Sequence, residues 1–172
     1  YAPAADVSAA VAASAAAGAV LAVAAVNGPA HTVVSGAAAD EVFAGYHWYP
    51  PMGEPDAAGI DGSVTRYRAA FFDRDHGGVD ALATEGLVAG DDPSGAFVTE
   101  HFTRAGAETG VDRALRLDTT VMLVDDPVKR VDNMTMSWGL EGRVPFLDHE
   151  LVELAASCPP ERWPASAPSC ST

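Results

Sequence analysis

The spacing of apolar residues along the chain predicts a mostly helical fold. Between residues 117 and 138, seven mostly apolar positions recur at alternating intervals of four and three, the period of one face of an α-helix. They are Leu117, Val121, Val124, Val128, Val131, Thr135 and Trp138. Pro127 interrupts this run, and Asp126 before it is suited to cap a new helix. We therefore predict two helices, roughly 111–124 and 127–138, that meet at a kink.

Weaker periodic patterns predict four more helices. They cover Ser63–Asp73, Val79–Val88, Ala96–Ala105 and His149–Ala156. Asp148 precedes the last of them as a capping residue. The charged run Asp73–His76, which precedes Gly77, indicates the solvated end of the first of these helices. Pro145 favours an extended segment over Arg143–Leu147.

Strand character is scarce, and the most distinctive motif of the chain follows the one stretch that has it. Thr32–Gly36 is short and partly β-branched, which predicts a buried strand in a small parallel element. The motif Ser35–Tyr46 reads SGAAADEVFAGY, and a helix is expected from Asp40 to Tyr46, ended by the prolines that follow. These features predict an α/β fold that is predominantly helical.

This strand–helix junction has the residue types of a phosphate site. Small residues let the backbone approach a ligand, and N–H groups at the start of a helix point at an anion. Asp40 and Glu41 would repel a bare phosphate, but Mg²⁺ is usually held by one or two carboxylates together with phosphate oxygens. The pattern therefore suggests a phosphate bridged by a metal ion. The alternative is that Asp40 is a helix cap and nothing more.

Aromatic residues gather immediately after the motif. The run Tyr46–Met52 reads YHWYPPM. We favour the interpretation that it forms a packed corner of the core. The alternative is a wall of an adenine or substrate pocket, because such pockets are largely apolar and aromatic.

Composition narrows the classes of function. The chain has 172 residues, of which 48% are hydrophobic, and this is typical of a globular domain. A net charge of −14 disfavours nucleic acid as a partner. Cys158, Cys170 and the five scattered histidines show neither the spacing of a metal site nor that of a disulfide framework.

The two ends of the chain differ from its middle. Residues 1–30 form an Ala-rich segment, predicted to be a low-complexity or helical lead-in. Val7–Val26 has the length of a membrane span, but alanine is weakly apolar and no charges flank the segment. Residues 159–172 are rich in proline and serine and are predicted to be a mobile tail. We expect a cytoplasmic protein without a membrane partner. Because the chain does not begin with Met, we also expect a fragment, with its domain at 31–158.

Two motifs, in this order along the chain, resemble the asparagine synthetase family. Lys129–Asp148 reads KRVDNMTMSWGLEGRVPFLD, and the family carries a similar run that ends in R-V-P-F-L-D. The stretch Ser35–Tyr46 resembles the family motif S-G-E-G-A-D-E-[LV]-F-[AG]-G-Y. The segments GYHWYPPM, FFDRDH and LRLDTTVMLVDDPVKRVDN resemble one branch, the N-acetylglutaminylglutamine amidotransferases, which make an osmoprotectant. The resemblance covers about residues 32–160.

The resemblance implies part of an asparagine synthetase domain, with an adenine-nucleotide α-hydrolase-like α/β fold. The implied reaction uses ATP and Mg²⁺ to adenylate a small-molecule carboxylate. Ammonia from a glutaminase domain, which this chain does not contain, then displaces AMP. Ser35 and Gly36 match nucleotide-binding positions, and Asp40 matches a metal-binding carboxylate. Three further candidates for the wall of the site are Glu41, Tyr46 and Asp132.

Departures from the family pattern limit what the resemblance implies. Ala37 replaces an acidic or polar residue, so the catalytic group stays unassigned, and Ala38 replaces a glycine. The family's S-G-G-x-D-S pyrophosphate loop and its downstream lysine have no counterpart here. We therefore expect this polypeptide alone to be inactive.

The second motif has structural interpretations beside catalytic ones. Trp138, Glu141, Arg143 and Asp148 are interpreted as structural, with Arg143 as an ion-pair partner for a buried carboxylate. Lys129 and Arg130 could reach phosphate, or belong to a solvated helix face. Two readings of the whole chain stay open beside the amidotransferase: a β-lactam synthetase-like adenylating amide former, and a truncated or catalytically inactive structural domain.

Overall fold

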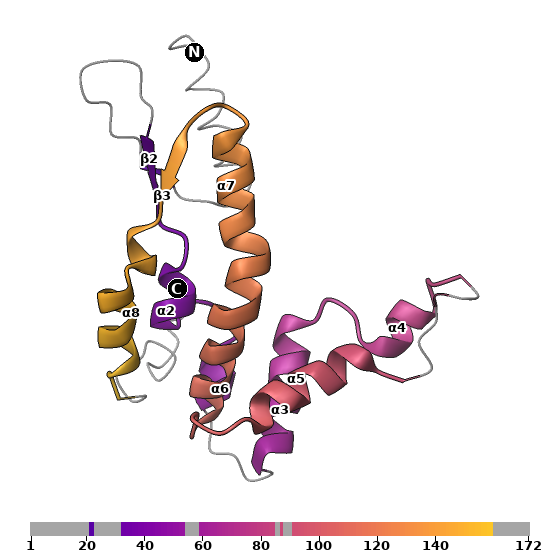
Figure 1. The fold of residues 1–172 in the computed structure, drawn as a ribbon. Helices are drawn as coiled ribbons and strands as arrows, with labels where there is room; N and C mark the ends of the chain where they lie inside the picture. The colour runs from indigo at the N-terminus through magenta and orange to yellow at the C-terminus, as the bar shows by residue number, and fades with distance from the viewer. Residues whose placement is uncertain (1–20, 23–31, 54–58, 85–86, 88–90, 160–172) are drawn as a thin grey trace, which may run out of the picture. The chain divides into compact units, whose positions relative to one another are not determined.

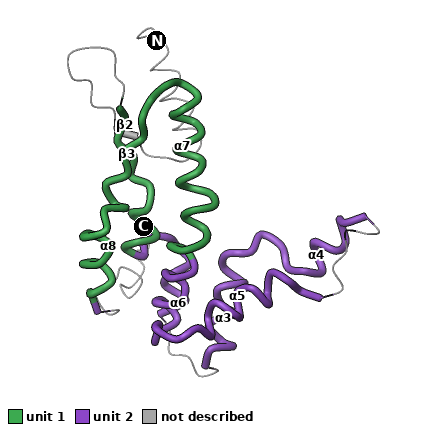
Figure 2. The backbone as a smooth tube through the Cα atoms, viewed as in Figure 1, with its two compact units in different colours: residues 1–43, 118–158 green, residues 44–117, 159–172 purple. Residues whose placement is uncertain are grey.

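The chain folds into two compact units. In a computed structural model the described residues are 21–22, 32–53, 59–84, 87 and 91–159. Residues 1–43 and 118–158 form unit 1, and residues 44–117 and 159–172 form unit 2 (Figure 2). The segment 31–158, which the sequence suggested as one domain, therefore contributes to both units. The predictions for most of the lead-in and for nearly all of the tail fall outside the described residues.

A small sheet lies at the centre of unit 1. Strand β2 (Thr32–Ser35) pairs in parallel with β3 (Glu141–Arg143), and Val33 lies opposite Gly142. Val33 and Leu140 bury their side chains together. The predicted strand at Thr32–Gly36 and its parallel pairing are therefore confirmed, with the strand one residue shorter.

The third strand corrects an expectation. Strand β1 (Leu21–Ala22) pairs antiparallel with β2, within the segment that was expected to be a helical or low-complexity lead-in. Alanine and leucine favour helix by intrinsic propensity. At these two residues the free edge of β2 supplies backbone hydrogen-bond partners, and tertiary pairing overrides that weak preference.

Residues 118–136 of unit 1 are helical and contain two π-helical segments. These are η2 (Asp118–Met122) and η3 (Val124–Val128), and α7 (Lys129–Met136) continues from them. Figure 1 shows α7 beside β3, and the two elements are in contact.

The predicted break before Pro127 is wrong. Pro127 lies inside η3, and the side chain of Asp126 forms an ion pair with Arg130 instead of capping a helix. A π-helix forms i→i+5 hydrogen bonds, and its wider turn accommodates a residue without an N–H group. The hydrogen bond from Arg130 lowers the pKa of the Asp126 carboxyl.

The π-helical turns also change which residues face inward. Leu123, which the predicted stripe omits, is 2% exposed, whereas Val124 is 52% exposed and Trp138 is 41% exposed. Val131 and Thr135 are buried, as the stripe predicts. A turn with more residues shifts the phase of the helix, so a constant period fails across η2 and η3.

Three short helices complete unit 1. They are α2 (Ala39–Phe43), η4 (Pro145–Leu147) and α8 (His149–Ala156), and α2 packs against α8. The carboxylate of Asp148 accepts hydrogen bonds from the backbone N–H of Glu150 at 3.0 Å and of Leu151 at 3.4 Å, which confirms the predicted cap. The predicted extended segment Arg143–Leu147 is wrong, because the strand ends at Arg143 and a 3₁₀ turn follows.

Unit 2 is a helical assembly with an aromatic core. Its elements are η1 (Pro50–Gly53), α3 (Gly59–Phe71), α4 (His76–Asp80), α5 (Pro93–Thr103) and α6 (Gly110–Leu117). Helices α3, α5 and α6 pack against one another. Tyr67 contacts both Phe71 and Phe102, with ring centroids 5.2 and 5.3 Å apart. Tyr49 and Met52 are fully buried, consistent with a packed corner.

Two helices of unit 2 begin earlier than the sequence patterns predict. The carboxylate of Asp75 accepts a hydrogen bond from the Gly78 N–H at 2.8 Å, so α4 begins at His76 and the two glycines lie inside it. Asp92 caps α5 in the same way, through the Gly95 N–H at 2.8 Å. The sequence interpretation assigned Asp75 to the solvated end of the preceding helix instead, because an acidic residue before glycine is typical of helix ends and loops as well as of helix starts.

The helix expected over Asp40–Tyr46 is also shorter than predicted. It ends at Phe43, because Ala44 has a φ of 54°. A residue in the left-handed region cannot continue an α-helix, so the helix stops well before the prolines.

Among the residues that the structure describes, no helix combines the length and the apolar character needed to cross a membrane.

Replacing Gly110 with alanine should destabilise unit 2. A Cβ atom there would lie 2.7 Å from the Met52 carbonyl oxygen and 2.9 Å from the Ser63 Oγ, so the backbone must shift. Overpacking of this kind costs about 1–3 kcal/mol. The control Gly77→Ala meets nothing closer than 3.8 Å and should stabilise α4 by about 0.5–1 kcal/mol. Urea unfolding measures both, and a shift of the two variants in the same direction contradicts this packing.

Replacing Ala38 with glycine should leave stability almost unchanged. Ala38 is buried with a φ of 77°, a conformation that costs a non-glycine residue about 1–2 kcal/mol. Glycine removes this strain but loses a buried methyl group worth about 0.8 kcal/mol and gains freedom in the unfolded chain. Ala114→Gly, at a buried helical position, relieves no strain and should cost about 1.5–2 kcal/mol. Equal losses in the two variants, measured by urea unfolding, would argue against strain at Ala38.

Candidate functional site

The predicted phosphate site lies at the junction of β2 and α2 in unit 1. Ser35 ends the strand with a buried side chain, and its Oγ accepts a hydrogen bond from the Ala37 N–H at 3.1 Å. The Gly36 carbonyl accepts a hydrogen bond from the Ala39 N–H at 3.2 Å. A serine that bonds to the backbone two residues on stabilises a tight turn. The sequence Ser-Gly therefore ends the strand and directs the chain into α2.

Ala38 has the backbone conformation that most favours glycine. Its φ is 77°, and its carbonyl accepts the hydrogen bond of the Val42 N–H at 2.9 Å, which begins α2. The resembling family motif has glycine at this position, for which positive φ costs nothing. The turn thus keeps the geometry of the motif although the residue differs.

The two adjacent carboxylates of α2 have different environments. Asp40 is exposed, whereas Glu41 is 1% exposed. Across the described ranges, no group of three or more His, Cys, Asp or Glu side chains is arranged to hold a metal ion. Mg²⁺ in nucleotide sites typically takes one or two protein carboxylates and completes its shell with phosphate and water oxygens. An exposed carboxylate beside a small-residue turn fits that donor set, with Asp40 as a single ligand.

A buried carboxylate that the sequence did not suggest as a candidate lies on the neighbouring element. Asp118, the first residue of η2, is 0% exposed, and η2 is in contact with α2. Burial of a carboxylate is costly, and such groups concentrate at functional sites. Glu41 and Asp118 thus place two buried carboxylates on contacting elements. The sequence did contain a signal: Asp118 directly follows Leu117, a position of the apolar stripe. The search for apolar positions ignored it because aspartate is charged.

Two of the predicted wall residues lie on other parts of the chain. Asp132 is exposed on α7. Tyr46 belongs to unit 2, where its ring stacks on Trp48 with centroids 4.1 Å apart. Their part in a common site stays a prediction.

The second motif forms ion pairs at the surface of unit 1. Lys129 pairs with Asp125 at 2.5 Å, and Arg143 pairs with Glu141 at 2.9 Å. The expectation that Arg143 neutralises a buried carboxylate is therefore wrong, because Glu141 is exposed. The two residues extend from the short strand β3, whose ends leave their side chains in solvent.

Comparison with known proteins identifies the family. A model of the asparagine synthase family matches residues 4–163, which include the β2–α2 turn and the segment from η2 to α8. The match begins within the Ala-rich segment. No curated protein and no solved structure matches the chain. Proteins of this family are amide-forming, ATP-dependent ligases with an adenine-nucleotide α-hydrolase-like α/β fold, and Mg²⁺ is typical of them. With a match over nearly its whole length and a parallel strand that turns into a helix at Ser35–Asp40, the chain belongs to the asparagine synthase family.

Proposed function

We propose that this chain is the synthetase part of a glutamine-dependent ligase that amidates a small-molecule carboxylate. In the first step a carboxylate oxygen bonds to the α-phosphorus of ATP, and the bond from that phosphorus to pyrophosphate breaks. In the second step ammonia bonds to the carbonyl carbon, loses a proton, and the bond to AMP breaks. The family match supports the reaction class.

The observation that carries the proposal is the turn between β2 and α2. In open α/β sheets, ligands bind at the carboxyl ends of the strands, and β2 ends at Ser35. Ser35 and Gly36 would present backbone groups to the nucleotide, because neither side chain obstructs its approach. Asp40, exposed in the first turn of α2, would hold the metal ion. Mg²⁺ held there would supply positive charge to neutralise the leaving pyrophosphate.

The net negative charge of the chain is a further reason to expect a metal ion at the exposed Asp40. At a net charge of −14, ATP is repelled unless its phosphates are neutralised. A carboxylate that binds Mg²⁺ converts this repulsion into an attraction for the metal–nucleotide complex. Glu41, Tyr46 and Asp132 stay candidates for the wall of the site, and the catalytic group stays unassigned because Ala37 has only a methyl group.

For the acceptor we propose N-acetylglutaminylglutamine, with an amide product that serves as an osmoprotectant. The support comes from GYHWYPPM, FFDRDH and the segment around Asp126 and Lys129, which resemble that branch. The alternatives are a β-lactam synthetase-like adenylating enzyme and a catalytically inactive structural domain, which the methyl group of Ala37 favours.

The choice of acceptor is tested with the intact enzyme, ATP, Mg²⁺ and glutamine labelled with ¹⁵N in its side-chain amide. We expect ¹⁵N in the amide of N-acetylglutaminylglutamine, together with release of AMP and pyrophosphate, and background signal with aspartate. Transfer to aspartate instead would assign an asparagine synthetase. Labelled product from neither acceptor, without AMP release, would favour the inactive domain.

Asp40→Asn should reduce turnover strongly while leaving the fold intact. The change removes a metal-binding charge, and losing one such electrostatic contact costs on the order of 10²–10³ in turnover. Asp40 is exposed and lies within α2, after its first residue Ala39, so it is not the helix cap that the sequence left open. Its replacement should cost at most the roughly 0.3–1 kcal/mol of one acidic charge in the first turn of a helix, so the melting temperature should fall only slightly. Pyrophosphate release against Mg²⁺ concentration and thermal melting measure the two effects.

The matched control for this variant is Glu153→Gln, which removes an exposed carboxylate from α8 in the same unit. It should leave both turnover and melting temperature unchanged. Normal turnover of Asp40→Asn at limiting Mg²⁺ would remove Asp40 from the site and leave it as an exposed residue in the first turn of α2.

A further inference from the structure

Unit 2 contains a cavity that the proposed reaction does not use. It has a volume of about 470 Å³ and lies between the end of α3, helix α4 and the first turn of α5. Phe72, Val79 and Pro93 give it an apolar wall. The volume is within the range of about 300–1,000 Å³ that is typical of small-molecule sites. All of its described lining belongs to unit 2, so it includes no residue of the β2–α2 turn.

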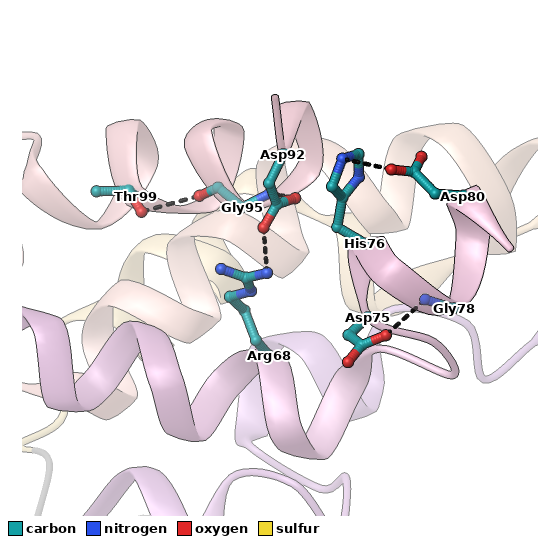
Figure 3. A network of polar contacts seen from close by, with 8 residues as sticks. All are labelled: Arg68, Asp75, His76, Gly78, Asp80, Asp92, Gly95 and Thr99. Carbon is teal, nitrogen blue, oxygen red and sulfur yellow. Dashed lines mark hydrogen bonds and ion pairs between the residues drawn. The ribbon is translucent and has the colours of Figure 1, made fainter. Parts of the chain in front are cut away.

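Two polar contacts hold the floor of this cavity in place. Arg68 forms an ion pair with Asp92, and His76 Nε2 lies 3.3 Å from Asp80 Oδ2 (Figure 3). The hydrogen bond from the Gly95 N–H, followed by the one from Arg68, lowers the pKa of Asp92. These charges are partnered within the protein, so they shape the cavity and do not need a ligand.

Two other charges at the cavity have no such partner. Asp73 and Arg74 both line it, both are exposed, and neither forms a hydrogen bond or ion pair in the part of the chain that the structure describes. They are also consecutive, yet they do not pair with each other. Val79, beside them, leaves 51% of its surface exposed although it is apolar. The cavity therefore has one negative and one positive charge without a protein partner, next to an apolar wall that is partly exposed to solvent.

We propose that this cavity binds a free α-amino acid with an apolar side chain. The carboxylate of Asp73 takes the ammonium group, and the guanidinium of Arg74 takes the carboxylate. Consecutive Cα atoms are about 3.8 Å apart, so two neighbouring side chains can reach the two ends of one small zwitterion. The apolar side chain of the ligand covers Val79 and the rings and methylene groups of the wall.

The charge balance at the cavity excludes simpler ligands. A plain anion would be repelled by the carboxylate of Asp73, which has no partner among the described residues. A plain cation would leave Arg74 without a partner. A neutral apolar molecule would gain nothing from either exposed charge. Only a ligand that carries both signs satisfies both.

The test is an NMR titration of the 172-residue chain with L-phenylalanine. We expect saturable shifts of the backbone amides of Arg74, Val79 and Ser94, with a Kd on the order of 1 mM because both charges are exposed. N-acetylphenylalanine lacks the ammonium group and phenylalanine amide lacks the carboxylate, so each should bind several-fold more weakly. Glycine, without an apolar side chain, should not saturate.

Paired variants separate the cavity from general effects of charge and surface. Arg74→Gln should weaken phenylalanine binding about two- to fivefold, the range expected for an exposed ion pair. Val79→Ser should weaken binding by a similar factor, because it removes apolar surface that the ligand would cover. Their controls lie in unit 1: Arg143→Gln and Leu154→Ser remove an exposed arginine and an exposed apolar residue, and should bind as the unchanged chain does.

Three outcomes would overturn the proposal. One is the absence of shifts at the cavity amides up to tenfold above the expected Kd. Another is equal binding of phenylalanine and its N-acetyl or amide derivative, which would assign a site for a cation, an anion or an apolar molecule. The third is an equal loss of binding in the control variants. Because every variant changes an exposed residue, circular dichroism should show unchanged folding in all of them.

Discussion

The parallel pairing of β2 with β3 is the constraint on which unit 1 depends. It joins two motifs about a hundred residues apart, with Val33 opposite Gly142. The approach of α7 to β3 is close at Gly142, where a Cβ atom would lie 3.2 Å from both Thr135 Oγ1 and Val131 Cγ1 and would displace those side chains by a few tenths of an ångström. Because β3 contacts both β2 and α7, the packing of α7 and the strand pairing depend on each other. The position of the turn that follows β2 depends on both.

Local chemistry in the sequence was sufficient to predict several elements. The strand at Thr32 and the cap at Asp148 were predicted because each depends on residues within a few positions. The strand at Leu21 and the division into two units were not, because both depend on pairing between distant segments. The π-helical turns were not predicted for another reason. An analysis of periodicity assumes a constant number of residues per turn, and this number changes around Leu123.

The candidate site was predictable to the extent that it is contiguous. Ser35, Gly36 and Asp40 form one turn, and the motif alone places them together. The burial of Asp118, on an element that contacts α2, became clear only in three dimensions, because its place beside Leu117 on the apolar stripe does not show which element it approaches. Tyr46 shows the opposite case: it lies only a few residues from Asp40 along the chain, but it belongs to unit 2, where its ring stacks on Trp48.

The π-helical segment Asp118–Met122 has a consequence for how the chain length of such proteins can vary. A π-helical turn holds one residue more than the α-helical turn it replaces, while the helix on either side keeps its direction. Loss of one residue here, for example the exposed Thr120, would restore an α-helical turn without rotating α7 away from β3. Related chains can therefore differ by a single residue within this helix, where an insertion or deletion would ordinarily turn every later side chain to the wrong face.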